Sequence, residues 1–297
     1  MQLTAGDYEI TRLVHRHRFL SSAHIKALTE NASQQLLRRL QLLYHHGYLE
    51  RPRAQIDYYH EGGSRHIVYG LGDKGAALLG RHIGAPARRT RSGEKNRAVG
   101  RIFLEHALLV SEVMVALELA CRKAGQIRLL TEEDLPLYRD PGLPRQPFRW
   151  NVPVESNLGI GIAPDRAFAL EYPGEAGDRE RAFFFLEADR GTMPVIRRNL
   201  AQTSFYRKLL AYEATWSQSL HRTRFGFHRF RVLTVTESPE RVRSLVNACS
   251  QLKRGHGLFL FADRTVLANP DLLFSPVWQT GRPGEMVSLL NDPATIS

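Results

Sequence analysis

Apolar residues recur at helical spacing three times within the first 46 residues, and this pattern limits the folds open to the N-terminal part. The spacing predicts a helix over 7–18 and a short one that follows Ser21-Ser22 and runs through Ile25 and Leu28. After a Thr-Glu-Asn turn, a third helix is expected over 32–46.

The third helix carries apolar residues on one face and polar or basic residues on the other. The apolar face consists of Leu36, Leu37, Leu40, Leu43 and Tyr44. The candidate DNA contacts from this helix are Ser33, Gln34, Gln35, Arg38 and Arg39. A guanidinium can bind O6 and N7 of guanine, and a glutamine amide can bind N6 and N7 of adenine. A helix-turn-helix whose third helix has such a face is typical of major-groove readers.

A hairpin is expected to follow the third helix. Its strands are predicted over 55–59 and 66–71 with a turn at 61–64, and Gly72–Ala76 opens a fourth helix. The whole pattern resembles winged-helix domains, with Arg65 on a wing that can reach a phosphate or a minor groove. A winged helix used for protein–protein contact is the alternative, and the basic charge of the chain makes it the weaker one.

The balance of charge favours a polyanionic partner. Lys and Arg number 41 against 30 Asp and Glu, which gives a formal net charge of +11. The two cysteines, Cys121 and Cys249, lie far apart and show no metal-ligand spacing, which suits a reducing compartment. The most apolar stretch, 107–121, is interrupted by two glutamates, so no membrane span is expected. We therefore expect a soluble protein of the bacterial cytoplasm.

A basic segment separates the N-terminal pattern from the rest of the chain. We place a linker over 83–98, and Arg88, Arg89 and Arg91 in it are candidate phosphate contacts. A solvated tether is an equally good interpretation, and the two are compatible.

The remaining pattern predicts an α/β (α+β) domain, a mixed sheet flanked by helices. Helices are expected over 99–123, 195–215 and 239–251. Strands are expected over 127–130, 148–154, 167–172, 183–189, 229–236 and 257–262. The predicted organisation is a winged helix-turn-helix over 1–82, the linker over 83–98, the sheet domain over 99–270 and a C-terminal tail over 271–297.

Three carboxylates fall on the first long hairpin of this domain. Asp165 opens one strand, while Glu187 and Asp189 end the next and share a face because they are two residues apart. An antiparallel hairpin would bring the three together, where oxygen-rich clusters suit Mg²⁺ or Mn²⁺. Such an ion lowers the pKa of a bound water and stabilises phosphoryl transition states. Alternatively, Asp165 caps a turn and the other two acids pair with Arg166 and Arg190.

The motif Pro164-Asp165 followed by Glu187-Ala188-Asp189 resembles the PD-(D/E)xK nuclease fold. The longer string over 184–192 and the helical segment 104–108 are similar to the plasmid replication-relaxation family. That family joins a winged helix to a nuclease-like domain and includes MOB-C mobilisation relaxases, which nick plasmid DNA at a transfer origin. The resemblance spans roughly residues 5–265.

The resemblance implies roles for particular residues. Asp165, Glu187 and Asp189 would be the metal-binding acids, and Glu112 the additional acid such nucleases place on a helix, with Glu105 as a competitor. The lysine expected two residues after Glu187 is absent, because Asp189 stands there. Lys208, with Tyr212 four residues on along the same helix face, is the candidate substitute.

Two functions follow. The favoured one is a Mg²⁺- or Mn²⁺-dependent, site-specific DNA nickase (relaxase) of plasmid mobilisation or replication, acting through activated water. The alternative is a non-catalytic DNA-binding initiator, relaxosome accessory factor or transcriptional regulator with a degenerate nuclease domain. The expected partners are double-stranded DNA at an origin of transfer or replication and other relaxosome proteins. The three intact acids favour the nickase, and the missing lysine favours the alternative.

Overall fold

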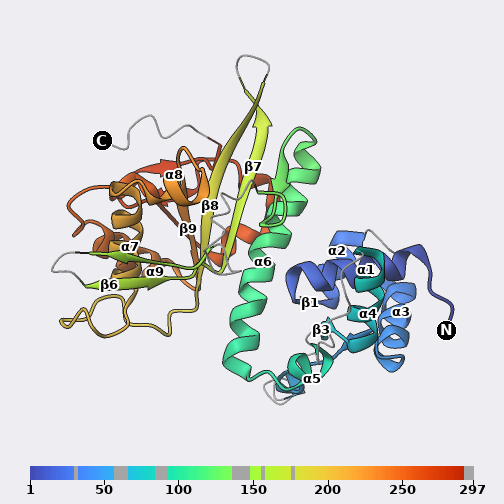
Figure 1. Cartoon of the computed structure of the whole chain (residues 1–297). Coiled ribbons are helices and arrows are strands. Elements are labelled where there is room, and N and C mark those ends of the chain that lie inside the picture. The colour runs from blue at the N-terminus through green and yellow to red at the C-terminus, as the bar shows by residue number, and fades with distance from the viewer. Residues whose placement is uncertain are drawn as a thin grey trace. The chain divides into compact units, whose positions relative to one another are not determined.

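The computed structural model describes residues 1–29, 33–56, 66–83, 92–135, 148–154, 158–174 and 178–290. The chain divides into two compact units, Met1–Val115 and Ala116–Ser297, and the division falls within the long helix α6 (Arg101–Ala124) (Figure 1). The fold is mixed α/β, as expected from the sequence, with helices first and the large sheet second.

The first unit is built on a helix-turn-helix. Its helices are α1 (Ala5–His17), α2 (Ser22–Thr29), α3 (Ser33–His45), α4 (Asp73–Ile83), α5 (Ser92–Arg97) and the first part of α6. Asp7 sets the start of α1, because its carboxylate accepts hydrogen bonds from the backbone N–H and the hydroxyl of Thr4. Arg18, with φ of 68°, ends α1. Ile10, Leu13 and Val14 of α1 are buried, as their spacing predicts.

A three-stranded antiparallel sheet completes this unit. Its strands are β1 (Phe19–Ser21), β3 (Val68–Leu71) and β2 (Leu49–Glu50), in the order β1-β3-β2. The strand expected over 55–59 is wrong at its start, because residues 53–56 form a 3-10 turn. The Gln55 side chain takes the place of a strand there, since its amide both donates to the carbonyl of Val68 and accepts from its N–H. Arg65 lies outside the described residues.

Part of the expected linker is ordered structure in the first unit. α5 covers Ser92–Arg97, and the Asn96 amide donates to the Leu71 carbonyl at the end of β3. Arg97 pairs with Glu50 of β2. These contacts attach α5 to the small sheet. Arg88, Arg89 and Arg91 lie outside the described residues.

The second unit contains a seven-stranded mixed sheet in the order β12-β11-β10-β9-β8-β7-β4 (Figure 1). The strands are β4 (Arg128–Leu130), β7 (Arg166–Pro173), β8 (Arg179–Asp189), β9 (Arg231–Thr236), β10 (Phe259–Asp263), β11 (Trp278–Thr280) and β12 (Met286–Val287). β8, β9 and β10 are parallel to one another, and the other neighbours are antiparallel. β11 and β12 come from the segment expected to be a tail, so that segment extends the sheet.

Three helices and a two-stranded ribbon accompany the sheet. They are α7 (Phe205–Ser217), α8 (Leu220–Phe225), α9 (Pro239–Cys249), β5 (Trp150–Pro153) and β6 (Gly159–Ile162). Their shared core is aromatic: Trp150 lies against Phe185 and Phe225, and its indole N–H donates to Thr215 on α7. α7 begins ten residues later than the sequence predicts, because the Ser204 hydroxyl caps it by accepting from the Arg207 N–H.

Candidate functional site

The β7–β8 hairpin brings Asp165 and Glu187 to the same end of the sheet. The antiparallel pairing expected from the sequence is present, with Arg166 opposite Leu186. Asp165 precedes β7; its N–H donates to the Leu186 carbonyl, and its carboxylate accepts from the Ala188 N–H at 2.8 Å. Those two backbone groups flank Glu187, so Asp165 lies beside Glu187 across the hairpin.

Helix α7 supplies the two groups that contact the Glu187 carboxylate. Lys208 Nζ lies 2.5 Å from Glu187 Oε2, and the Tyr212 hydroxyl donates to Oε1 at 2.6 Å. One helical turn separates the lysine from the tyrosine, so both reach the same side chain. Glu187 is only 1% exposed, whereas the Lys208 side chain is 36% exposed. The lysine is therefore the member of this group that solvent or a ligand can reach.

The electrostatics of the cluster follow from its burial. Burial raises the pKa of Glu187, and the charge of Asp165 raises it further, against the opposing effect of Lys208. Burial lowers the pKa of Lys208, but the two carboxylates outweigh burial and the net shift is upward. Burial and the Glu187 carboxylate raise the pKa of Tyr212, so its hydroxyl stays protonated and donates a hydrogen bond to Glu187. At neutral pH Lys208 is thus a fixed cation beside two carboxyl groups.

Asp189 belongs to a different contact from the one expected. Its carboxylate pairs with Arg241 of α9 at 2.7 Å and accepts from the Thr236 hydroxyl at 3.1 Å. The same guanidinium donates to the Met193 carbonyl, which ties the loop after β8 to α9. The structure therefore brings together Asp165, Glu187 and Lys208, while Asp189 is paired with Arg241 and acts on Lys208 only through its charge. Glu112 lies on the part of α6 that belongs to the first unit.

This donor set limits how a divalent ion could bind. Within the described part of the chain, no three His, Cys, Asp or Glu side chains form a metal-binding group. Asp165 and Glu187 remain a two-carboxylate pair, and Mg²⁺ is commonly bound by one or two carboxylates with waters and substrate phosphates completing the shell. The two carboxylates are the kind of ligand that such an ion prefers. The three-acid set expected from the sequence does not come together in the described residues.

Helix α3 presents the candidate DNA-binding face of the first unit. Gln34, Gln35 and Arg38 are exposed, and Leu36 and Leu40 are buried, as expected. Leu37 was expected in the core, but it is 51% exposed and lies on the polar face. The helical spacing explains the difference, because a residue beside the centre of the buried stripe at Leu36 is turned about 100° away from it.

Two members of the predicted DNA-contact set, Arg39 and Ser33, differ from the other three. Arg39 forms an ion pair with buried Asp7, so its guanidinium connects α3 to the start of α1. The side chain of Ser33 is not among the described ones, although its backbone opens α3. Gln34, Gln35 and Arg38 are therefore the expected contacts that the structure leaves facing outward.

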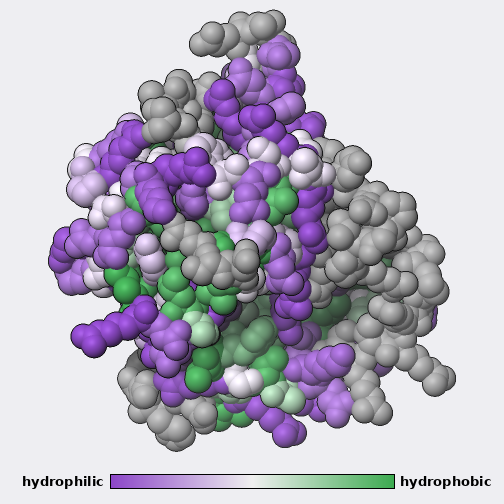
Figure 2. Space-filling model, turned by 60° about the vertical axis from the view of Figure 1, so that its left-hand side comes forward, coloured by the Kyte–Doolittle hydropathy of each residue, from purple (hydrophilic) through white to green (hydrophobic). Residues whose placement is uncertain are grey.

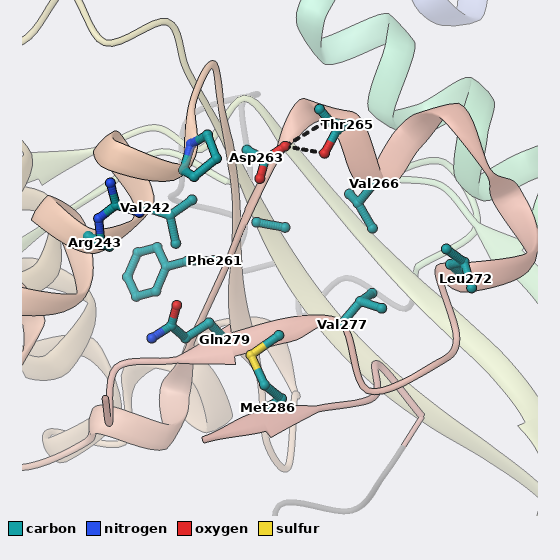
Figure 3. Close-up of a pocket in the computed structure, with 12 residues that line it drawn as sticks. Val242, Arg243, Phe261, Asp263, Thr265, Val266, Leu272, Val277, Gln279 and Met286 are labelled. Atoms are coloured by element: carbon teal, nitrogen blue, oxygen red, sulfur yellow. Dashed lines mark hydrogen bonds between the residues drawn. The ribbon is translucent and has the colours of Figure 1, made fainter. Parts of the chain in front are cut away.

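A pocket of about 400 Å³ lies elsewhere on the second unit, beside α9 and strands β10, β11 and β12 (Figure 3). Its walls are mainly apolar, with Phe261 and Met286 among them. Its two charged residues are occupied: Asp263 accepts from Thr265, and Arg243 pairs with Glu240. The pocket thus lacks the grouped polar side chains that Asp165, Glu187 and Lys208 provide.

Short helices with a small antiparallel sheet, followed by a mixed sheet with an acid–lysine cluster, define a mixed α/β protein of two units. The chain matches the replication-relaxation family over residues 12–228, a stretch that holds both α3 and the Glu187 cluster. It belongs to that family, which suggests a role in plasmid replication or mobilisation. No curated protein and no solved structure matches the chain. Of the helices in the described ranges, none has both the length and the hydropathy to cross a membrane.

Proposed function

We propose that this protein binds double-stranded DNA at a plasmid origin of replication or transfer through α3, and nicks it at the Asp165–Glu187–Lys208 cluster with Mg²⁺ or Mn²⁺. The observation that carries the proposal is the contact between Lys208 and Glu187 beside Asp165. A nuclease of the PD-(D/E)xK kind needs two acidic residues and a lysine in one active site. Here the lysine comes from α7 instead of from β8.

Each residue has a distinct part in the proposed reaction. Asp165 and Glu187 would hold the ion, which when bound supplies an acidified water as the attacking group. Lys208 holds a positive charge at the mouth of the cluster, where it can stabilise charge that develops on the scissile phosphate. Tyr212 fixes the Glu187 carboxylate from the buried side. Its protonated, buried hydroxyl does not suit a tyrosine nucleophile.

The alternative, a non-catalytic DNA-binding initiator, accessory factor or regulator, has an observation of its own. Both Glu187 oxygens already have partners, and the described residues contain no three-ligand metal group. In this alternative the ion pair between Lys208 and Glu187 is structural. DNA binding would then be the whole function, carried by α3 and the basic charge of the chain.

The DNA-binding part is tested on its own with Arg38→Ala. Loss of a guanidinium that binds a base edge should cost about 1–3 kcal/mol on the specific duplex and reduce the preference over random sequence. Arg12→Ala, at an exposed position of α1, is the matched control. Equal affinity of the Arg38 variant and wild type would remove α3 as the reading helix.

The nuclease part is tested by incubating the protein with supercoiled DNA from its own replicon, with and without Mg²⁺ or Mn²⁺. We expect metal-dependent conversion to the open circle and an upward shift of the melting temperature in Mn²⁺, because a ligand stabilises the state that binds it. Absence of both effects would reject the nickase and leave the DNA-binding alternative.

A further inference from the structure

An arginine cluster lies across β4 and the β7–β8 hairpin, away from the acid–lysine cluster. Arg128, Arg179 and Arg181 all contact one carboxylate, that of Glu171, at 3.3, 3.4 and 2.9 Å. The arginine side chains are 68%, 42% and 44% exposed, while the Glu171 side chain is 6% exposed. We call these four residues the hairpin arginine cluster.

Strand register explains why the cluster forms. Arg128 of β4 pairs with Glu171 of β7, and Glu171 pairs with Arg181 of β8, so the three stand in one row across three strands. Arg179 is two residues from Arg181 and shares its face. The Arg181 hydrogen bond holds the pKa of Glu171 below its ordinary value, so the carboxylate stays charged. Three positive charges against one negative charge leave the cluster with an excess of two.

Pairing with Glu171 alone does not account for three arginines. One guanidinium is enough to pair with Glu171, and exposed ion pairs contribute only about 0–1 kcal/mol. Each further guanidinium at the same carboxylate also repels the first. An excess of positive charge on exposed, planar, multi-donor groups suits a partner that carries closely spaced phosphates.

The cluster lies on the same face of the hairpin as Glu187. Residues 181 and 187 on β8 are six apart, as are 165 and 171 on β7, and an even separation keeps side chains on one face. Packing agrees, because the intervening Ala167, Ala169 and Phe185 all belong to one core cluster. Phe168 and Phe184, whose side chains lie on the opposite face of the strands, stack with each other. Six residues of strand place the two clusters roughly 20 Å apart.

The hairpin projects beyond the rest of the sheet in Figure 1, and its projecting end is hydrophilic in Figure 2. This position agrees with the exposure of the three arginine side chains.

We propose that Arg128, Arg179 and Arg181 form a second DNA contact, separate from the Asp165–Glu187–Lys208 cluster, which binds the phosphate backbone. This inference rests on the proposed DNA-binding function and extends it to a surface of the second unit. The contact is independent of sequence, because it involves phosphates and no base edges.

The test compares two triple variants of the full chain with equal charge. The test variant is R128Q/R179Q/R181Q. The control variant is R122Q/R254Q/R264Q, which removes three exposed arginines of the same unit, each from an ion pair with a different acid. Affinity for a random-sequence duplex of about 30 base pairs and for its single strand is measured over a range of salt concentrations.

We expect the test variant to bind at least about tenfold more weakly at low salt, and its slope of log K against log salt to be shallower by about 2–3, at ~0.9 per lost phosphate contact. The control should stay near wild type. Loss on the duplex, on the single strand or on both supports the contact and identifies the form of DNA bound. Equal slopes for the two triple variants would overturn the proposal.

If the triple variant does not fold, Glu171→Gln provides a second test of the phosphate contact. Freeing the three guanidiniums from their carboxylate should strengthen DNA binding several-fold, although it lowers the melting temperature. If the cluster only crosslinks strands, DNA affinity will not change, and the proposal fails. Wild-type nicking is assayed in parallel, so that a missing nickase activity is distinguished from a missing phosphate contact.

Discussion

Lys208 Nζ on α7 lies 2.5 Å from Oε2 of Glu187 on β8, although the two residues are 21 positions apart in the chain. Glu187 is buried, whereas the Lys208 side chain is partly open to solvent. The position two residues after Glu187, where the nuclease motif has its lysine, holds Asp189 instead. Lys208 is thus the cation on which the proposed chemistry depends.

Lys208→Met should reduce nicking by about 10²-fold, as loss of a preorganised charge does elsewhere, and Lys208→Arg should keep part of the activity. The pH dependence of stability separates this role from packing. The raised pKa of Glu187 contributes stability at low pH that is lost as pH rises through the folded-state pKa. Without the charge of Lys208 the pKa of Glu187 is higher still, so more stability is lost as the pH rises. The difference in free energy of unfolding between wild type and Lys208→Met should therefore be smaller at pH 5 than at pH 7. Urea denaturation at pH 5 and at pH 7 measures this difference. A difference that does not change with pH would contradict the charge interaction between Lys208 and Glu187.

Asp189→Asn should affect stability and leave nicking largely intact. The carboxylate pairs with Arg241, whose side chain is only 14% exposed, and removing one partner of a buried pair costs about 3 kcal/mol. Melting temperature and nicking rate are measured on the same preparation. A stable variant that no longer nicks would return Asp189 to the metal ligands.

Leu37 should recognise a thymine methyl group, since it is an exposed apolar residue between polar side chains on α3. Replacing thymine by uracil in the binding site removes that methyl group. Wild type should lose affinity for the substituted site, whereas Leu37→Ala should bind both forms equally and unfold at the wild-type temperature. A Leu37→Ala variant that still discriminates thymine from uracil would exclude this contact.

The helix-turn-helix should become less stable in mild acid because of His24. Burial, followed by the charges of His17 and His66, lowers the pKa of His24 from 6.5 to about 4. The unfolded chain takes up the proton first, so stability is complete above pH 6.5 and falls toward pH 4, by up to about 3 kcal/mol. Hydrogen exchange of the α2 amides follows this change. His24→Gln should flatten it, and an equally steep decline in that variant would assign it to other groups.

The sequence predicts those parts of the site that depend on local periodicity. Asp165 and Glu187 follow from two β-forming segments joined by a polar turn, and Lys208 and Tyr212 follow from one turn of helix. The contact between Asp189 and Arg241 joins residues 52 apart, and no local pattern indicates it. A charge pair of this kind depends on how α9 packs on the sheet, which is a property of the tertiary structure.

The same limit explains the differences in the fold. Gln55 replaces strand backbone with a side-chain amide, so a segment that resembles a strand in sequence is a turn. Leu37 is apolar like a core residue, but its angular position on α3 directs it to the exposed face. β11 and β12 are short and separated by a turn, so their place in the sheet depends on pairing with β10.

The most direct test of the proposed nickase is the initial rate at which Glu187→Gln nicks supercoiled DNA in Mn²⁺, relative to wild type. Glutamine keeps the shape of glutamate and removes the charge, so we expect the rate to fall at least ~10²-fold while α3-mediated DNA binding persists. The Mn²⁺-dependent shift in melting temperature should disappear in the same variant. A Glu187→Gln variant that nicks at the wild-type rate, or a wild-type product covalently attached to a tyrosine, would contradict the metal-and-water mechanism.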